Sequence, residues 1–269
     1  MSKIAIIMSV YKNDNLADLK EALESLYEQT KVADIFIQED GLLTNSLELF
    51  LDNELKEKRI EYLGKRKENF GLAYGLNELL KKVLPTYEYI ARMDADDISV
   101  KNRIEKQVKF LEKNKEVDVV GGWIKEFNID SNLTQVVTYG ESIDDIKKNL
   151  LKRNPMAHVT VCFRNRFFDT IHAYDISKSN EDFDLWIRAL KKGLKLHNLQ
   201  EVLVEVRTSN AFFNRRRNIK RAWEVMMLKF NASRYFSFGL NGYVYAVAHF
   251  LLFLSPSLVK QLIYKKLRG

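Results

Sequence analysis

The spacing of apolar residues changes at regular intervals along the chain, from continuous apolar runs to apolar positions at helical spacing. Apolar runs typical of strands buried on both faces occur at 3–10, 34–38, 60–63 and 89–93. Between them, leucines at helical spacing predict helices over 16–26 and 72–80. Strands and helices in this alternation predict a mostly parallel, doubly wound α/β sheet.

The alternation becomes less regular in the second half of the chain. A helix face at 104–111 is followed by a predicted strand at 117–122, a helix at 143–151 and a strand at 159–163. Another helix should begin near residue 181, because Leu185, Trp186 and Ala189 start an apolar helical face. The 269 residues suit one large α/β domain, with or without a tail.

Polar residues follow directly after three of the predicted strands. In a parallel sheet these strand ends share one edge, so their side chains should converge on one crevice. The polar residues are Ser9 and Tyr11, then Glu39 and Asp40, then Asp94, Asp96 and Asp97.

The three acids of 94–97 can be interpreted in two ways. Carboxylates this close raise one another's pKa unless a cation lies among them. Mg²⁺ or Mn²⁺ is usually held by one or two carboxylates plus substrate phosphates. The alternative is an acidic turn that caps the helix beginning near Lys101.

Several other kinds of site are not indicated. The chain has neither G-x-G-x-x-G after the first strand nor G-x-x-x-x-G-K-[ST], so a nucleotide would be held by metal and carboxylates. His158 is expected to be a structural residue, and the absence of a Cys/His cluster argues against zinc. The lone Cys162 lies in an apolar run, which favours a buried thiol and a reducing compartment.

Three polar residues precede the apolar face of the helix that should begin near 181. Asn180 or Asp182 could cap this helix by accepting from its free N–H groups. A helix N-terminus also keeps a carboxylate ionised, as a general base requires at neutral pH. Both interpretations of Glu181 and Asp182 stay open at this point.

Charge is unevenly distributed along the chain. The whole chain carries +7, but residues 207–269 hold twelve Lys and Arg against the single acid Glu224. These residues therefore carry +11 and residues 1–206 carry −4. The basic end should contact something anionic, either nucleic acid or a membrane surface.

Residues 243–254 are almost wholly apolar, and a second short helix is predicted to end at Arg268. Twelve residues are too few to span a bilayer, which needs about 20. They suit a helix in the membrane interface, with packing on the preceding domain as the alternative. The chain enters a strand at once without a signal-like run, so a cytoplasmic protein is expected.

Five stretches, taken together, resemble the family 2 glycosyltransferases, inverting enzymes of the GT-A fold. Residues 103–107 and 154–158 look like the subgroup that builds bacterial O-antigen, capsule and exopolysaccharide repeats. Two stretches depart from the family pattern: Ser9-Val10-Tyr11-Lys12 replaces Pro-Thr-Tyr-Asn, and Glu39-Asp40-Gly41-Leu42 replaces Asp-Asp-Gly-Ser. The five stretches are Met8-Ser9-Val10-Tyr11, Glu39-Asp40-Gly41, Asn69-x-Gly71-Leu72 with Asn77, Asp94-Ala95-Asp96-Asp97, and Glu181-Asp182-x-Asp184-Leu185-Trp186.

The resemblance implies a role for each of these residues. Asp40 would accept from the uracil of a UDP-sugar, and Ser9 and Tyr11 would line the base pocket. Asp94 would hold the ribose or the metal, and Asp96 would bind the Mn²⁺ or Mg²⁺ that bridges the diphosphate. Asp182 would take the proton of the acceptor hydroxyl, so one displacement inverts the anomeric carbon without a covalent intermediate. Acceptor binding or support would fall to Asp97, Glu181, Trp186 and His158.

The predicted organisation is a GT-A catalytic domain at 1–210 and a basic, amphipathic helical tail at 211–269. Residues 1–100 would bind the nucleotide and 101–210 the acceptor. The implied function is transfer of a β-linked hexose from a UDP-sugar to an undecaprenyl-diphosphate-linked sugar, on an anionic membrane at its cytoplasmic face and without nucleic acid.

Two alternatives belong to other functional classes. A sugar nucleotidyltransferase would carry a Gly-rich basic loop after the first strand, which residues 12–15 do not resemble. A non-catalytic membrane- or nucleic-acid-binding module would leave both acid clusters unexplained.

Overall fold

The computed structural model describes residues 3–131, 133–209 and 219–255. Its centre is a nine-stranded sheet with the order β3-β2-β1-β4-β8-β6-β9-β5, and β7 pairs with β6. The first four strands are mutually parallel, as predicted. The elements of this half are β1 (Ile4–Val10), α1 (Leu16–Tyr27), β2 (Asp34–Glu39), α2 (Asn45–Lys56), β3 (Tyr62–Gly64), α3 (Leu72–Val83) and β4 (Tyr89–Met93).

The second half adds mixed strands to the same sheet. β8 runs antiparallel between β4 and β6, whereas β9 is parallel to β6 and antiparallel to β5. The elements are β5 (Ile98–Ser99), α4 (Arg103–Lys113), β6 (Val119–Asn128), β7 (Thr134–Val137), α5 (Ile143–Lys152), η1 (His158–Thr160), β8 (Cys162–Arg164), α6 (Phe167–Ile171), α7 (Glu181–Lys191), β9 (Leu196–Thr208), α9 (Ile219–Tyr235) and α10 (Gly239–Leu254).

The strand predicted at 159–163 is placed too early. Thr160 donates to the carbonyl of Ala157 from both its backbone N–H and its hydroxyl. These bonds close a 3₁₀ turn, so the extended strand begins only at Cys162. Cys162 itself is fully buried in this strand.

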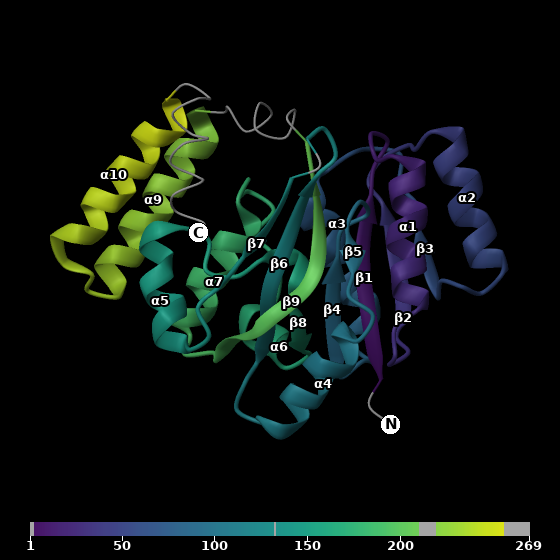
Figure 1. The fold of residues 1–269 in the computed structure, drawn as a ribbon, viewed down its shortest axis with the longest axis horizontal. Coiled ribbons are helices and arrows are strands. Elements are labelled where there is room, and N and C mark those ends of the chain that lie inside the picture. The colour runs from purple at the N-terminus through teal and green to yellow at the C-terminus, as the bar shows by residue number, and fades with distance from the viewer. Residues whose placement is uncertain (1–2, 132, 210–218, 256–269) are drawn as a thin grey trace.

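Helices cover both faces of the sheet, and each face has its own core (Figure 1). Helices α1, α2 and α4 bury leucine, isoleucine and valine against one face. Helices α3, α5, α6 and α7 pack against the other face, which also holds the aromatic core around Phe163, Phe167 and Trp186. This arrangement leaves the carboxyl ends of the parallel strands as one edge.

Helices α9 and α10 lie side by side at the end of the molecule opposite α2 (Figure 1). Helix α9 buries Val225, Leu228 and Ala232 in the core that it shares with α7. Helix α10 packs on α9 and leaves Val244 and Leu251 exposed. The predicted tail therefore begins, within the described residues, as a helix packed into the core on one face of the sheet. The last predicted helix lies outside the described residues. No helix in the described ranges is long and apolar enough to cross a bilayer.

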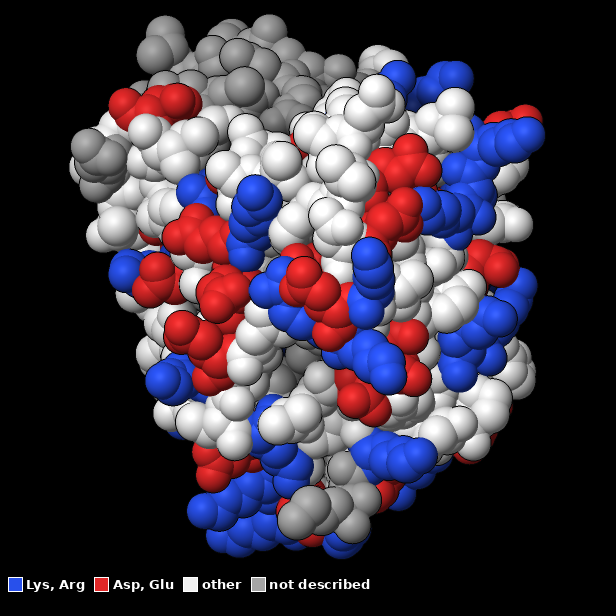
Figure 2. Space-filling model, turned by 90° about the vertical axis from the view of Figure 1, so that its right-hand side faces the viewer, with Lys and Arg blue, Asp and Glu red and all other residues white. Residues whose placement is uncertain are grey.

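The surface at the α1–α2 end carries charges of both signs (Figure 2). Lys65 lies 2.7 Å from Asp52 and 3.2 Å from Glu48, and Arg59 lies 3.2 Å from Glu57. Because the signs are interspersed, the surplus positive charge of the chain is not concentrated on this face.

Candidate functional site

A cavity of about 430 Å³ opens where β1, β2 and β4 end. Its lining contains all five residues predicted to bind nucleotide or metal: Ser9, Tyr11, Asp40, Asp94 and Asp96. The sheet brings them together from positions up to 87 residues apart, because parallel strands end at a common edge.

Asp40 is fixed by donors from the turn that follows β3. Phe70 N–H donates to Oδ1 at 2.9 Å and Gly71 N–H to Oδ2 at 3.0 Å, and Arg66 forms an ion pair with Oδ1. The Arg66 guanidinium lies over the Tyr74 ring at 4.6 Å. Asp40 is therefore held in a fixed position at the cavity wall, where its remaining acceptor capacity can meet a ligand N–H.

The three acids after β4 have different partners. Arg92 donates from both terminal nitrogens to Asp94. Asp97 is 3% exposed and accepts from the N–H of Arg207 at 2.9 Å, and burial raises its pKa well above the usual value. Burial and the nearby charge of Asp94 raise the pKa of Asp96 to about 6.

The acidic turn does not cap the following helix. The N-terminal cap of α4 is Asn102, which makes no side-chain capping bond, and the helix begins at Arg103. The capping interpretation of the 94–97 acids is therefore wrong.

A sixth polar residue of the cavity, Asp14, was not predicted. It accepts from the N–H of Tyr11 at 2.9 Å, and burial raises its pKa to about 7, against the effect of that bond. The charges of Asp94 and Asp96 raise it further. The signal in the sequence was its place in the polar loop after the first strand, three residues beyond Tyr11.

The carboxylates of the cavity fit a cation that is shared with a diphosphate. In the described ranges, no group of three or more His, Cys, Asp or Glu side chains is arranged to hold a metal by itself. Burial and neighbouring carboxylates nevertheless raise the pKa values of Asp14 and Asp96, and a bound cation would offset that repulsion. Mg²⁺ and Mn²⁺ take one or two carboxylates and complete their shell with phosphate and water.

The second acid cluster lies at the start of α7, as predicted. Asp182 accepts from Phe183 N–H at 2.7 Å and from the side chain of Asn154. Burial raises the pKa of Asp182, and burial together with Asp182 raises the pKa of Glu181 to about 7. Asn180 is the cap residue but makes no side-chain capping bond. Asp182 thus takes one free N–H of the helix and keeps acceptor capacity for a proton.

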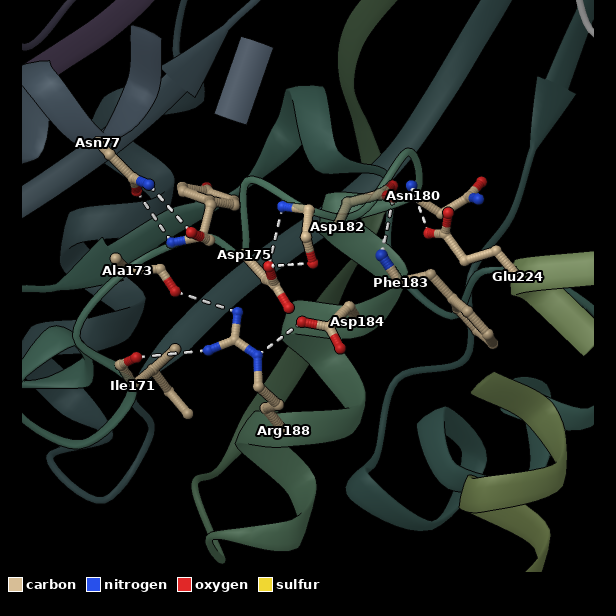
Figure 3. Close-up of polar contacts among 12 residues, drawn as sticks. Asn77, Ile171, Ala173, Asp175, Asn180, Asp182, Phe183, Asp184, Arg188 and Glu224 are labelled. Carbon is tan, nitrogen blue, oxygen red and sulfur yellow. Dashed lines mark hydrogen bonds and ion pairs between the residues drawn. The ribbon is translucent and has the colours of Figure 1, made fainter. Parts of the chain in front are cut away.

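Asp184, two residues after Asp182, forms an ion pair with another residue of the same helix. Its carboxylate pairs with Arg188 Nε at 2.6 Å, and Arg188 donates to the carbonyls of Ile171 and Ala173 (Figure 3). This network ties α7 to the end of α6. Of the three acids at this helix, Asp182 and Glu181 are therefore the candidates for proton transfer.

Two of the predicted acceptor or support residues lie inside the core. His158 is 8% exposed and its Nε2 lies 2.9 Å from Tyr174 Oη; burial and Arg92 lower its pKa far below the usual value. Trp186 is fully buried and stacks on Phe163. Tyr174 is in turn bonded through its backbone to Asn77 of α3. These residues connect α7 to the sheet and to α3.

Known proteins that are similar to this chain are glycosyltransferases. Residues 5–174 match the model of glycosyl transferase family 2. An uncharacterized glycosyltransferase of Haemophilus influenzae is 35% identical over 98% of this chain and 97% of its own. The UDP-Gal:α-D-GlcNAc-diphosphoundecaprenol β-1,3-galactosyltransferase of Escherichia coli is 29% identical over 98% of this chain and 96% of its own.

Two solved structures share the fold. S. aureus TarS 1–349 in complex with UDP-GlcNAc gives a TM-score of 0.63 at 17% identity, with 99% of this chain and 85% of that chain covered. The Pyrobaculum calidifontis mannosyltransferase PcManGT in complex with GDP-Man and Mn²⁺ gives 0.66 at 14% identity, with 98% and 79% covered. The predicted GT-A fold is thereby confirmed. The chain belongs to glycosyl transferase family 2.

Proposed function

We propose that the protein moves a hexose from a UDP-sugar to a hydroxyl of a lipid-linked sugar, with inversion, in the synthesis of a bacterial surface polysaccharide. The observation that carries the proposal is the single cavity that unites Ser9, Tyr11, Asp40, Asp94 and Asp96 at one sheet edge. The name of the E. coli relative and the UDP-GlcNAc in the TarS structure support the choice of donor and acceptor.

The donor would be held mainly by hydrogen bonds and a shared cation. Asp40 accepts from the uracil N–H while Ser9 and Tyr11 line the base, and Asp94 lies where ribose or a metal-bound water can reach it. When Mn²⁺ or Mg²⁺ is bound at Asp96, it neutralises negative charge on the diphosphate as UDP leaves. Manganese in the PcManGT complex supports this choice of ion.

Asp182 is proposed as the general base. Its carboxylate takes the proton of the acceptor hydroxyl while that oxygen forms a bond to the anomeric carbon and the bond to the diphosphate breaks. The hydrogen bonds from Asn154 and Phe183 fix the carboxylate for this step. Glu181, Asp97, His158 and Trp186 support the site by charge and packing.

The apolar surface of α10 is proposed to hold the protein on the cytoplasmic face of an anionic membrane, near a lipid-linked acceptor. Val244, Val247 and Leu251 are exposed on this helix, with Tyr243 and Tyr245 beside them. Exposed apolar and tyrosine side chains suit the membrane interface, and the basic residues of 207–269 would be drawn to anionic lipid.

A transfer screen tests the proposal. Purified protein with Mn²⁺, an undecaprenyl-diphosphate-linked sugar and each of a panel of UDP-sugars should release UDP with one or two donors and only when acceptor is present. Release of diphosphate from a nucleoside triphosphate and a sugar 1-phosphate would instead show a nucleotidyltransferase. If no donor leads to UDP release, the proposed transferase function is wrong and a non-catalytic binding role is favoured.

A further inference from the structure

Helix α9 of the predicted tail is bonded directly to the turn that precedes the proposed base. The Glu224 carboxylate accepts from Ser179 N–H at 3.0 Å, Ser179 Oγ at 2.7 Å and Asn180 N–H at 3.2 Å. Figure 3 shows Glu224 reaching Asn180 next to Asp182. These bonds hold the pKa of Glu224 below its usual value although burial acts in the opposite direction. Glu224 is thus an ionised acceptor fixed on this turn.

Arg221, one helical turn before Glu224, makes a second bond to the same turn. Its Nε donates to Asn180 Oδ1 at 2.9 Å. The Asn180 side chain is therefore used on α9 instead of capping its own helix. The Glu224 carboxylate bonds the N–H of the cap residue Asn180 from outside the helix, and an anion beside a helix N-terminus is stabilised by the helix dipole.

Helix α9 is itself held in place by the core, so Glu224 and Arg221 bond the 179–180 turn from a rigid helix. Lys229 is 2% exposed and donates to the carbonyl of Leu151 at 2.6 Å. Tyr235 Oη donates to the carbonyl of Lys191 at the end of α7. Helix α9 thus contacts α7 at both of its ends.

We propose that α9 is part of the catalytic site: Glu224 and Arg221 are positioning residues that hold the 179–180 turn and, through it, the base Asp182. The proposal rests on the proposed function. Because Asp182 follows Asn180 by two residues, release of the turn shifts the carboxylate, and a shift of about 1 Å can lower a rate on the order of 10²-fold. Donor binding, which uses the cavity at β1, β2 and β4, would not change.

Arg221 should also change the pH dependence of the base. The charged and polar groups that face Asp182 are Arg92 from β4, Arg221 from α9, Asn154 after α5, Tyr174 before α7, and Glu181 on its own helix. Both arginines lower the pKa of Asp182 and Glu181, against burial. Removal of the Arg221 charge therefore raises these pKa values and moves the acidic limb of kcat to higher pH.

Four variants test the proposal in the full-length protein, with a water-soluble acceptor analogue so that membrane binding has no effect. Glu224→Ala should lower kcat about 10-fold or more with the donor Kd unchanged, and Glu224→Gln, which keeps one acceptor oxygen, should lower it less. Arg221→Gln should shift the acidic limb upward, and Arg221→Lys should restore it. Lys220→Gln, on an exposed position, and Glu78→Ala, on a partly exposed one, are charge-matched controls and should behave as wild type.

Wild-type kcat in both Glu224 variants together with an unmoved pH profile in Arg221→Gln would overturn the proposal and leave the proposed function standing. Wild-type protein that transfers no sugar at all would overturn both. If Glu224→Ala does not fold, the two Arg221 variants test the proposal. A pH shift in Arg221→Gln that Arg221→Lys reverses cannot be explained by a loss of stability.

Discussion

Arg92 donates from both of its terminal nitrogens to the carboxylate of Asp94. The Arg92 side chain is 4% exposed, and its positive charge lowers the pKa of Asp96 and Asp97 as well as those of Glu181 and Asp182. One buried cation therefore acts on both the donor cavity and the proposed base. Two acid clusters can lie near one another because Arg92 offsets part of their repulsion.

The first prediction concerns the metal. EDTA should abolish transfer and Mn²⁺ or Mg²⁺ should restore it, because the diphosphate would otherwise meet the acids of the cavity without a cation between them. Asp96→Ala should lose donor binding and activity together, as measured by calorimetry and UDP release. Undiminished transfer in EDTA would refute a metal role for Asp96.

The second prediction concerns the base. Asp182→Asn keeps the size of the side chain and its bond to Phe183 but cannot accept a proton, so kcat should fall about 10²-fold or more. Donor affinity should change little. Asp184→Asn is the matched control: it weakens the Arg188 pair and should lower the melting temperature, while folded protein keeps its turnover. Near-normal kcat in Asp182→Asn would transfer the role to Glu181.

The third prediction concerns pH. The base Asp182 must be ionised, and burial raises its pKa and also raises the pKa of its neighbour Glu181 to about 7. Because the two acids titrate as a pair, turnover at saturating donor should rise with pH through about 7. The free energy of unfolding should instead fall as pH rises. The Glu181 contribution is fully present below its unfolded value of 4.5 and is lost as pH rises through its folded value. If turnover does not change between pH 5 and about 8, the assignment of a buried acid at the start of α7 as the general base is contradicted.

The fourth prediction concerns the turn that holds Asp40. Gly71 has a φ of +90° and nothing lies within 4 Å of an added Cβ, so Gly71→Ala introduces backbone strain without crowding. We expect the free energy of unfolding to fall by about 1–2 kcal/mol. Gly193→Ala, at φ +79° and equally open, should cost a similar amount. Only Gly71→Ala should also weaken UDP-sugar binding in a titration; equal donor affinity in both variants would separate this turn from the nucleotide site.

The fifth prediction concerns the membrane. Attraction of basic residues to an anionic leaflet is about 1 kcal/mol for each Lys or Arg near the surface, and salt weakens it. The apolar α10 surface adds a contribution that salt does not weaken, so high salt should release the protein from anionic liposomes only in part, and detergent should release it fully. A chain lacking residues 239–269 keeps α9 and should fold but fail to bind. Wild-type protein left in the supernatant at low salt would refute membrane binding.

The grouping of Asp40 and Asp96 in one cavity could be predicted from the sequence because they follow strands that were recognisable locally. Asp40 and Asp96 are far apart in the chain, yet the parallel sheet alone brings them to one edge. Two elements with a visible signal were not predicted. Thr44 caps α2, which buries Leu47 and Leu51, and the thirteen residues of β9 include six leucine and valine residues.

The contacts between distant segments could not be predicted in the same way. The partner of Asp94 is two residues away, but that of Asn180 is Glu224, 44 residues later and across a helix interface. Local patterns carry no information about which helix lies against which turn, so the sequence left open whether the tail binds a membrane or packs on the domain. The structure packs α9 in the core beside α7.

Product analysis tests the proposed chemistry most directly. The donor selected by the UDP-release screen, given as the α-linked UDP-sugar with Mn²⁺ and an undecaprenyl-diphosphate-linked sugar, should yield a product heavier by one hexose. The anomeric proton of the new linkage, read by NMR, should show the β configuration, since one displacement by a base-activated hydroxyl inverts the carbon. An α-linked product, or an acceptor of unchanged mass with every UDP-sugar, would contradict inverting transfer by this site.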